Sequence, residues 1–472
     1  MRSACARILL IVAVAAAQAP GQARPQDKPP VVQLKASPAP EPRAAMTYQL
    51  LPTMLDQSPG NAAQLYYLAS QGASREKAGK WMEKIQQWLD TPLEKLPREE
   101  VAKAVGAYSG ALRQLELAAR KEHCRWDLPL TEGIAMLLPE LSRFRDLAKV
   151  LAVKVRLSIA KGDFGQAIHD LQTGLAMAGH IGEGPTLIQS LVATAIAEIM
   201  LNRVEELIQA PGAPNLYWSL TVLPRPFVDL RGPMQWEAAT LYLMFPRLRD
   251  LKTAELTPAQ WRALTDDLAQ SVQVLLTHPY RKGEPSAQTK LVLTALAVHT
   301  YPRAKQYLRS LGRTDEQIAA MPVQQVVAIY HVDTFDRLRD ESFKWFHVPY
   351  WQARAGLERA EDALRMARAR GEGLPFTALL PTLWRAYFMT AKLDRHVAAL
   401  RCIEAVRMYA AAHDGKPPAG LSDITAVPVP IDPIAGKPFA YKAVGNTVTL
   451  EGRAPAPAPP KDDLRYELTL TK

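Results

Sequence analysis

The residues whose types suit catalysis rarely have the spacing that a catalytic motif needs. His123 and Cys124 put an imidazole beside a thiol, but adjacent residues of a helix point in different directions, so they make a poor dyad. His331, Asp333 and Asp336 could ligate a metal from a loop. On a helix this spacing spreads them over different faces. Both groups therefore predict structural side chains rather than a nucleophile or a metal site.

Common motifs of catalysis and of metal or nucleotide binding are absent from the sequence. It contains no H-E-x-x-H, G-x-S-x-G, G-x4-G-K-[ST] or C-x-x-C pattern and no EF-hand loop. The run Gly182-Glu183-Gly184-Pro185 precedes a predicted helix, whose N-terminus could cradle an anion. Glu183 is itself acidic, which favours a plain turn. We expect neither a cofactor nor a bound metal.

Two segments combine aromatic rings with charged residues and are the best candidates for a binding surface. Exposed rings beside charges suit a peptide or a sugar. Rings packed between helices are the alternative, and this packing is the favoured interpretation of the two patches. The candidate binding residues are Tyr217, Trp218, Arg225, Asp229, Arg231, Trp345, His347, Tyr350 and Trp351.

Composition predicts a globular chain that does not bind nucleic acid. The 472 residues are 48% hydrophobic and 22% charged, which suits a protein with a sizeable core. The net charge is +10 and the pI is near 9.4. The basic residues are diluted, however: the stretch Arg354–Arg370 also contains Glu358, Glu361 and Asp362. Mixed signs at helical spacing predict a solvated helix face, whereas nucleic acid requires a clustered basic stripe.

The first residues have the pattern of a secretory signal peptide. Arg2 and Arg7 precede the apolar run Ile8–Ala17, and small residues follow. We assign residues 1–19 to the signal and expect a periplasmic or extracellular protein. No later stretch reaches 18 apolar residues in a row, so we expect no transmembrane segment in the mature chain. In an oxidising compartment Cys124 and Cys402 could form a disulfide, although sequence says nothing about their separation.

Helical periodicity dominates the chain after a proline-rich stretch. Residues 20–45 are predicted to form an extended linker, because prolines are frequent and no period is visible. Residues 46–378 are predicted to form a helical body. One stripe consists of Leu147, Leu151, Val155 and Ile159, and Gly162-Asp163 is expected to end that helix and cap the next. Such short helices must stack to bury their apolar stripes.

The turn Lys161-Gly-Asp-Phe164, followed by Ala167 and Leu171, resembles the second half of a tetratricopeptide hairpin. This resemblance implies a partly solenoid-like body. The runs Leu50–Ala69, Gly162–Leu187 and Asn215–Arg231 also resemble a family of uncharacterised exported helical bacterial proteins. That resemblance implies membership of the family but assigns no activity.

Residues 379–472 are predicted to form a long helix and a small β unit. The helix runs from near Pro381 to about Ala412, with Leu393, Val397, Leu400, Ile403 and Val406 on one face. Strands are expected at 439–441, 447–450 and 464–470, with a turn at Gly445-Asn446. The motif Asp432-Pro-x2-Gly436-x-Pro438-x2-Tyr441 resembles the C-terminal half of type II secretion pseudopilins, which implies a pilin-like α+β unit. In those proteins the last loop can bind calcium, but Asp462 and Asp463 alone are not a calcium cage.

These observations leave three functional hypotheses. The first is a mainly α exported protein that binds an envelope protein or peptide without catalysis. The second is an envelope hydrolase acting on peptide or glycan, with carboxylates brought together by folding. The third, from the pilin-like tail, is an accessory component of a secretion or pilus system. The sequence leaves the oligomeric state open.

Overall fold

The structure is a computed structural model. It describes residues 31–72, 75–130, 136, 138–251, 257–277, 287–374, 376–380, 383–456 and 458–471. The predicted signal peptide and the first part of the predicted linker, residues 20–30, lie outside the described residues.

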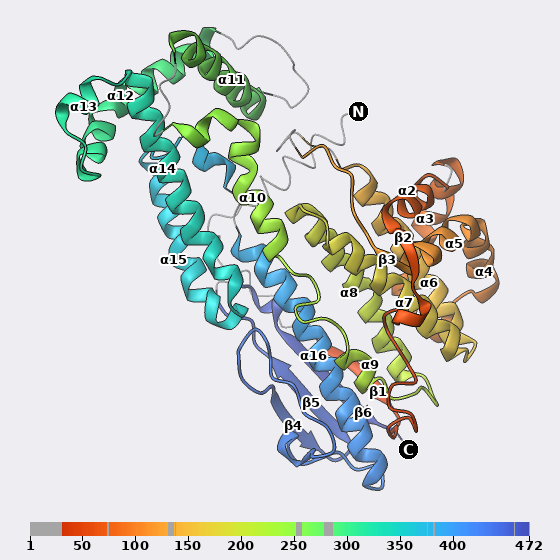
Figure 1. Cartoon of the computed structure of the whole chain (residues 1–472). Helices are drawn as coiled ribbons and strands as arrows, with labels where there is room; N and C mark the ends of the chain where they lie inside the picture. Colours follow the sequence, from red (N-terminus) through yellow and green to blue (C-terminus); the bar gives the residue numbers. More distant parts are fainter. Residues whose placement is uncertain are drawn as a thin grey trace.

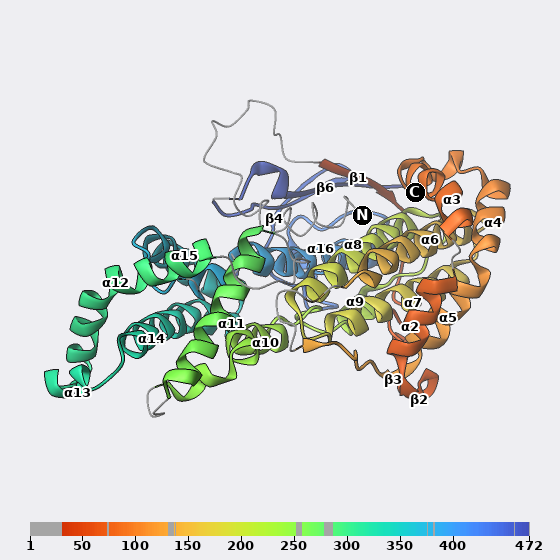
Figure 2. The same ribbon diagram turned by 90° about the horizontal axis from the view of Figure 1, so that it is seen from above.

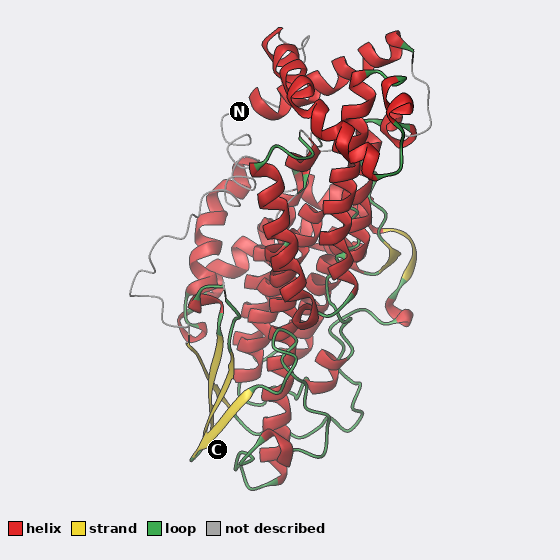
Figure 3. Ribbon diagram, turned by 90° about the vertical axis from the view of Figure 1, so that its left-hand side faces the viewer, coloured by secondary structure: helices red, strands yellow, loops and turns green. Residues whose placement is uncertain are grey.

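The described chain is mainly helical, as the sequence predicts, with a small sheet at the C-terminal end (Figure 3). A first group of helices forms one side of the molecule (Figure 1). The short strands β2 and β3 pair in parallel at the edge of this group. The group consists of β2 (Ser58–Asn61), α2 (Ala62–Gly72), α3 (Arg75–Asp90), α4 (Arg98–Ala107), α5 (Ser109–Ala119), β3 (Lys121–His123), α6 (Glu140–Ala160), α7 (Phe164–Gly182) and α8 (Leu187–Gln209), with the short 3-10 turns η1 (Met54–Asp56) and η2 (Leu93–Lys95).

The turn predicted between α6 and α7 is confirmed. Gly162 has φ +75°, the left-handed conformation that glycine adopts without steric cost. The Asp163 side chain accepts a hydrogen bond of 3.0 Å from the Gln166 N–H and caps α7. The two helices then fold back on each other, and α8 packs against both.

A second group of helices lies on the other side of the molecule, and the views in Figures 1 and 2 agree on this. The predicted body, residues 46–378, thus contains two groups of helices, with α8 and α10 in contact. The short α9 (Tyr217–Thr221) precedes this group and packs on α16. The second group consists of α10 (Arg231–Met244), η4 (Pro246–Asp250), α11 (Pro258–Thr277), α12 (Ala287–Ser310), α13 (Asp315–Ala319), α14 (Val323–Phe343), η5 (Lys344–His347), α15 (Tyr350–Ala369) and η6 (Phe376–Leu379).

The C-terminal unit has the predicted long helix and strands. Helix α16 (Trp384–Ala412) is followed by η7 (Leu421–Asp423), β4 (Ala440–Val444), β5 (Thr447–Gly452), η8 (Pro460–Asp462) and β6 (Leu464–Leu470). Alternate residues of β5 and β6 are buried, which puts one sheet face on α16, while the residues of the other face are half-buried. The predicted hairpin around Gly436 also forms, with φ +66° at that glycine and a 2.8 Å hydrogen bond from its N–H to the Asp432 carbonyl.

Part of the predicted linker is a strand, which corrects that assignment for residues 31–36. Strand β1 (Val31–Ala36) pairs in parallel with β6 and completes a sheet of order β1-β6-β5-β4. Leu34 and Ala36 are buried while Val31, Gln33 and Lys35 are exposed. This two-residue period precedes the first proline of the stretch 38–42, and proline density concealed it.

Among the described helices, α8 has the length and apolar composition that a membrane span would need. About 61% of its apolar window is buried inside the protein. It packs against α6, α7 and α16, which is the environment of a core helix.

Candidate functional site

Three of the predicted binding residues gather in and beside the loop between α9 and α10. Asp229 accepts hydrogen bonds from the backbone N–H of Arg231 at 2.9 Å and from its guanidinium at 2.6 to 3.0 Å. Burial alone would raise the pKa of Asp229, but the hydrogen bonds and charge of Arg231 lower it. Arg225 lies in the same loop, before a cis bond to Pro226, and donates to the Thr221 carbonyl at 3.2 Å.

The fold brings a fourth predicted residue, His347, to this loop. His347 is exposed at the end of η5, which contacts α10. Its charge contributes to the lowered pKa of Asp229. Arg225, Asp229, Arg231 and His347 are called the junction surface below, because they lie where the second group of helices meets α16. Arg225, Arg231 and His347 are exposed, so this surface is open to solvent.

A carboxyl group with an unusual pKa lies beneath the junction surface. Asp394 of α16 accepts a 2.9 Å hydrogen bond from the Phe227 N–H. Burial raises the pKa of Asp394 to about 7, although Phe227 and Arg225 act in the opposite direction. The neighbouring Tyr387 donates its hydroxyl proton to the Val348 carbonyl at 2.5 Å. Burial, together with the Asp394 and Asp229 charges, raises the pKa of Tyr387 to about 12.

The predicted aromatic residues near residue 350 mostly pack against the protein itself. The half-buried Trp345 lies on Gly356 of α15, where an added Cβ atom would overlap the indole. Trp351 is 44% exposed, but one face covers Gly436 of the C-terminal hairpin. Tyr350 is buried against Phe388 and Tyr387. Helix packing, the favoured prediction, accounts for the contacts of these rings.

Tyr217 and Trp218 contact residues outside the junction surface. Tyr217 is fully buried, with its hydroxyl on the Pro428 carbonyl and the guanidinium of Arg401 over its ring. The half-buried Trp218 donates its indole N–H to Glu41 at 2.5 Å. These two rings attach α9 to the C-terminal unit and to the N-terminal segment.

The N-terminus of α8 holds a carboxylate of this chain. The predicted turn ends at Thr186, whose hydroxyl caps the helix and is paired with Gln189. Glu237 of α10 accepts a hydrogen bond from the Leu187 N–H. Burial raises the pKa of Glu237 to about 7. The carboxylate of Glu237 thus occupies the N-terminus of α8, where an anion could bind, and connects α10 to α8.

His331, Asp333 and Asp336 lie on a helix, α14, and have separate surroundings. Asp336 accepts a 2.6 Å hydrogen bond from Tyr242, and Asp333 is 3.4 Å from the Tyr307 hydroxyl. His331 is 4% exposed, and neither ring nitrogen has a hydrogen-bond partner among the described residues. Within the described ranges, no group of three or more His, Cys, Asp or Glu residues could hold a metal ion. In the C-terminal unit, Asp462 pairs with Lys392 and Asp463 caps the Ala454 N–H.

The disulfide considered for Cys124 and Cys402 does not form. Both cysteines are buried free thiols. Cys124 follows β3 in the first group of helices, whereas Cys402 lies on α16 under the sheet. Burial raises the pKa of the Cys124 thiol well above its ordinary value and that of Cys402 to about 12. Neither thiol is therefore activated as a nucleophile.

The sequence analysis missed a buried charged cluster on α16. His396 contacts Glu198 through Nδ1 at 2.7 Å and Glu205 through Nε2 at 2.8 Å. The Tyr466 hydroxyl of β6 also donates to Glu205. Arg395, Arg401 and Arg407 recur every six residues, a spacing that distributes them around the helix. Arginines around a helix ordinarily indicate exposure, so their spacing gave no signal that α16 is surrounded by protein.

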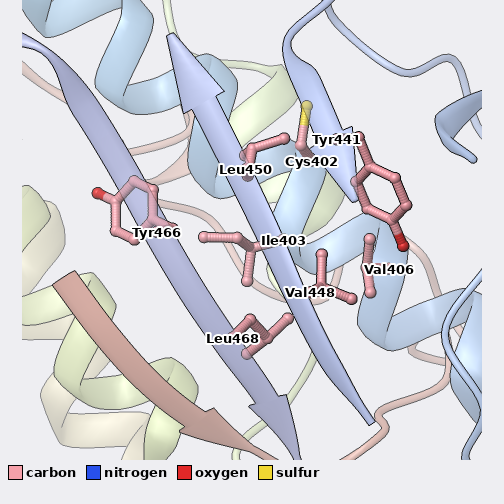
Figure 4. A pocket seen from close by; sticks show the side chains of 8 residues that line it. All are labelled: Cys402, Ile403, Val406, Tyr441, Val448, Leu450, Tyr466 and Leu468. Carbon is pink, nitrogen blue, oxygen red and sulfur yellow. The ribbon is translucent and has the colours of Figure 1, made fainter. Parts of the chain in front are cut away.

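A small cavity lies between α16 and the sheet, and it belongs to the core. Its volume is about 10 Å³, which holds about one water molecule. Figure 4 shows the side chains that line it, from α16, β4, β5 and β6. They are Cys402, Ile403, Val406, Tyr441, Val448, Leu450, Tyr466 and Leu468.

The junction surface thus brings together four of the nine predicted residues, three of which are exposed. No family model, no curated protein and no solved structure matches the chain.

Proposed function

We propose that this chain is an exported scaffold that binds a protein or peptide partner of the cell envelope and catalyses no reaction. The observation that supports this most strongly is the junction surface. The contact between η5 and α10 brings the exposed His347 to the side of the molecule where Arg225, Asp229 and Arg231 lie. Exposed arginine and histidine beside a carboxylate offer charge-assisted hydrogen bonds to a polar partner surface.

The architecture gives the proposal further support at the level of the whole body. The α6–α7 hairpin and the stacked α8 are consistent with a tetratricopeptide-like arrangement, which typically presents a surface to a peptide. Export is proposed from the N-terminal sequence alone. The partner would be an envelope protein or peptide rather than nucleic acid, because acidic residues interrupt the basic stretches.

A direct test uses the wild type and two charge variants as baits in a pull-down from envelope extract. The junction variant carries Arg225→Glu, which reverses the charge at position 225, and His347→Glu, which adds a negative charge at position 347. Lys416→Glu with Lys442→Glu changes residues of the C-terminal unit that are at least partly exposed and serves as the matched control. We expect the junction variant to lose at least ten-fold of the specific partner while the control retains it. Equal capture by both variants would exclude the junction surface as the binding site.

An envelope hydrolase is the second candidate, and it has one observation in its favour. Asp394 and Glu237 are carboxyl groups with pKa values raised to about 7, a range suited to general acid–base catalysis. Asp394 also accepts a hydrogen bond from the Phe227 N–H, and Glu237 accepts one from the Leu187 N–H. Both carboxyl groups therefore also have a structural role. Hydrolysis of a peptide or glycan library by the wild type that Asp394→Asn abolishes, without loss of folding, would favour this function.

An accessory role in a secretion or pilus system is the third candidate. It is supported by the packing of the long α16 on one face of a small sheet, an arrangement in keeping with a pilin-like unit. Self-association of the purified chain into filaments would favour it over the scaffold.

A further inference from the structure

The first described segment of the chain is held like a bound peptide. We call residues 31–41 the strap. Its first half, β1, runs parallel to β6 over six residue pairs, from Val31 opposite Arg465 to Ala36 opposite Leu470. Strand β1 lies at one edge of the sheet and contacts α8, and Figure 2 shows it beside β6. Residues from opposite ends of the described chain therefore meet at this edge.

Side chains from α16 and from the segment before α9 hold the strap by its backbone. Arg407 donates from Nε to the Ser37 carbonyl at 2.9 Å. Asn215 donates to the Ala39 carbonyl at 3.2 Å, and the Ala39 N–H donates to the Arg407 carbonyl at 3.2 Å. Gln209 of α8 accepts from the Lys35 N–H at 3.2 Å. Because these bonds are made to main-chain atoms, an extended segment of another sequence could make them too.

Three strap side chains fill the groove between β6, α8 and α16. Leu34 and Ala36 are each 1% exposed, and Ala39 is 6% exposed. The alternate residues Gln33 and Lys35 are exposed. The groove therefore fits an extended segment of the pattern Leu-x-Ala-x-x-Ala, with freedom at the positions between. This is the logic of strand addition, in which main-chain bonds give affinity and alternate side chains give specificity.

Buried polar groups of the groove depend on the strap for hydrogen-bond partners. Arg407 and its partner Glu404 are both fully buried, 2.9 Å apart, and Asn215 is 3% exposed. If the strap left, a buried guanidinium and a buried amide would lose acceptors, and β6 would become an open edge. Residues 42–47, by contrast, are exposed or half-buried, and the hydrogen bond from Thr47 to Ala44 within them is local. These residues connect the strap to the first group of helices.

We propose that the groove under the strap is a peptide-binding site for an extended segment of another polypeptide with the pattern Leu-x-Ala-x-x-Ala. The strap occupies this site and competes with the partner. The partner strand adds in parallel to β6 and receives the hydrogen bonds of Arg407 and Asn215. This site is separate from the junction surface, so either can fail while the other holds.

The test compares a full chain whose strap can move with the same chain whose strap is locked. Gln33 and Glu467 face each other in the β1–β6 register and both lie toward solvent. In the Gln33→Cys, Glu467→Cys chain a disulfide fixes the strap, and dithiothreitol releases it. The native Cys124 and Cys402 are buried and do not interfere; Cys5 is replaced by serine. The probe is a fluorescein-labelled peptide with the sequence of residues 31–41, measured by anisotropy.

We expect the reduced chain to bind the peptide at least ten-fold more tightly than the oxidised chain. The same peptide carrying Leu34→Asp should bind neither form. A second full chain, with Leu34→Asp in its own strap, should bind the unmodified peptide at least ten-fold more tightly than wild type, because its competitor is weakened. Circular dichroism checks that this variant is folded.

Equal binding to the reduced and oxidised chains would overturn the proposal, and so would no binding to the reduced chain. If Leu34→Asp prevents folding, the comparison of the reduced with the oxidised chain still tests the proposal. In the doubly substituted chain, disulfides that join position 33 of one copy to position 467 of another would support the groove as an acceptor, with the strap of a second copy as the occupant. A loss of partner capture by the junction variant is independent of all these outcomes.

Discussion

At the scale of single residues, buried charges on α16 hold the molecule together. Each charged side chain reaches a partner on another segment, as buried polar groups require. Arg395 donates to the carbonyls of Gly452 and Asp462, and Arg401 donates to Thr221 and to the Tyr217 hydroxyl. Arg407 holds the strap and Glu404. These residues fix relative positions of segments rather than provide a reactive group.

His396 should make the stability of the protein fall as the solution becomes alkaline. Burial disfavours the charged ring, but Glu198 and Glu205 outweigh burial and raise the pKa of His396 to about 10. The stabilisation is therefore complete below the unfolded value of 6.5 and is lost as pH rises through 10. His396→Gln should cost about 3 to 5 kcal/mol at pH 6, because it leaves two carboxylates without a cation.

Urea unfolding at pH 6 and pH 9.5 measures this effect. The wild type should lose stability between these pH values, and His396→Gln should lose much less. His413→Gln is the matched control, since His413 is exposed at the end of the same helix. A pH dependence that is the same in wild type and His396→Gln would show that the ring carries no charge in the folded protein.

His331 should make the protein sensitive to acid instead. Burial lowers the pKa of His331 to about 4, and neither nitrogen has a hydrogen-bond partner within the described part of the chain. Below pH 6.5 the unfolded chain binds the proton more readily, so stability falls as pH drops from 6.5 towards 4. The fall amounts to about 3 kcal/mol when the whole shift is counted.

Replacing His331 by leucine should remove this part of the acid loss. Urea unfolding of His331→Leu at pH 7 and pH 4.5 should show a smaller difference than the wild type does. His299→Leu, at an exposed position of α12, should retain the wild-type difference. If His331→Leu keeps the full acid loss, other groups cause it.

At the scale of elements, two tryptophans connect helices by lying on glycines. Trp345 covers Gly356 and so joins η5 to α15, while Trp351 covers Gly436 and joins α15 to the C-terminal hairpin. Both glycines lack a side chain where an indole must approach the backbone closely. The contacts explain why an aromatic patch that could be a binding surface is largely used for packing.

Gly356→Ala should destabilise the protein by about 1 to 3 kcal/mol, even though alanine is the better helix former. The added Cβ would overlap the indole of Trp345, so the ring must move. Gly106→Ala in α4 is the control, because no atom of the described residues lies within 4 Å of its added Cβ, and it should be neutral or stabilising by up to about 1 kcal/mol. Guanidinium unfolding of both variants checks the sign. A stabilised Gly356→Ala chain would mean that Trp345 does not rest on this glycine.

At the scale of the whole molecule, the two groups of helices and the sheet are joined by noncovalent contacts around α16. Its contacts include α8, α9 and α15, and its buried residues lie on all sides. Figure 2 shows α16 between the two groups of helices. Cys124 and Cys402 are buried free thiols, so no disulfide between them joins these parts.

The thiols should therefore be hidden and should not contribute a crosslink. In a Cys5→Ser chain, Ellman's reagent should detect almost no thiol in the native state and two after unfolding in guanidinium. Addition of a reductant should leave the midpoint of thermal unfolding unchanged. A drop in that midpoint with reductant would reveal a disulfide and contradict the separate burial of the two residues.

Much of the C-terminal unit could be predicted, because local signals determine it. The apolar period from Leu393 to Val406 and the turn at Gly445-Asn446 act over a few residues. The candidate site could be predicted only as a list of residues. The His347 charge acts on Asp229, and Trp345 packs on Gly356, because of how α10, η5 and α15 pack. The sequence pattern within each of these elements does not show how the elements pack on one another.

The sequence by itself determined the helical class, the break at Gly162-Asp163, and the helix and strands of the C-terminal unit. Each depends on side-chain periodicity or on the φ preference of a nearby residue. Only the tertiary structure decided that β1 joins β6, that His396 lies between two glutamates, and that the two cysteines are apart. These features depend on contacts between residues distant in the chain, whose energy comes from burial and partner geometry and leaves no local pattern.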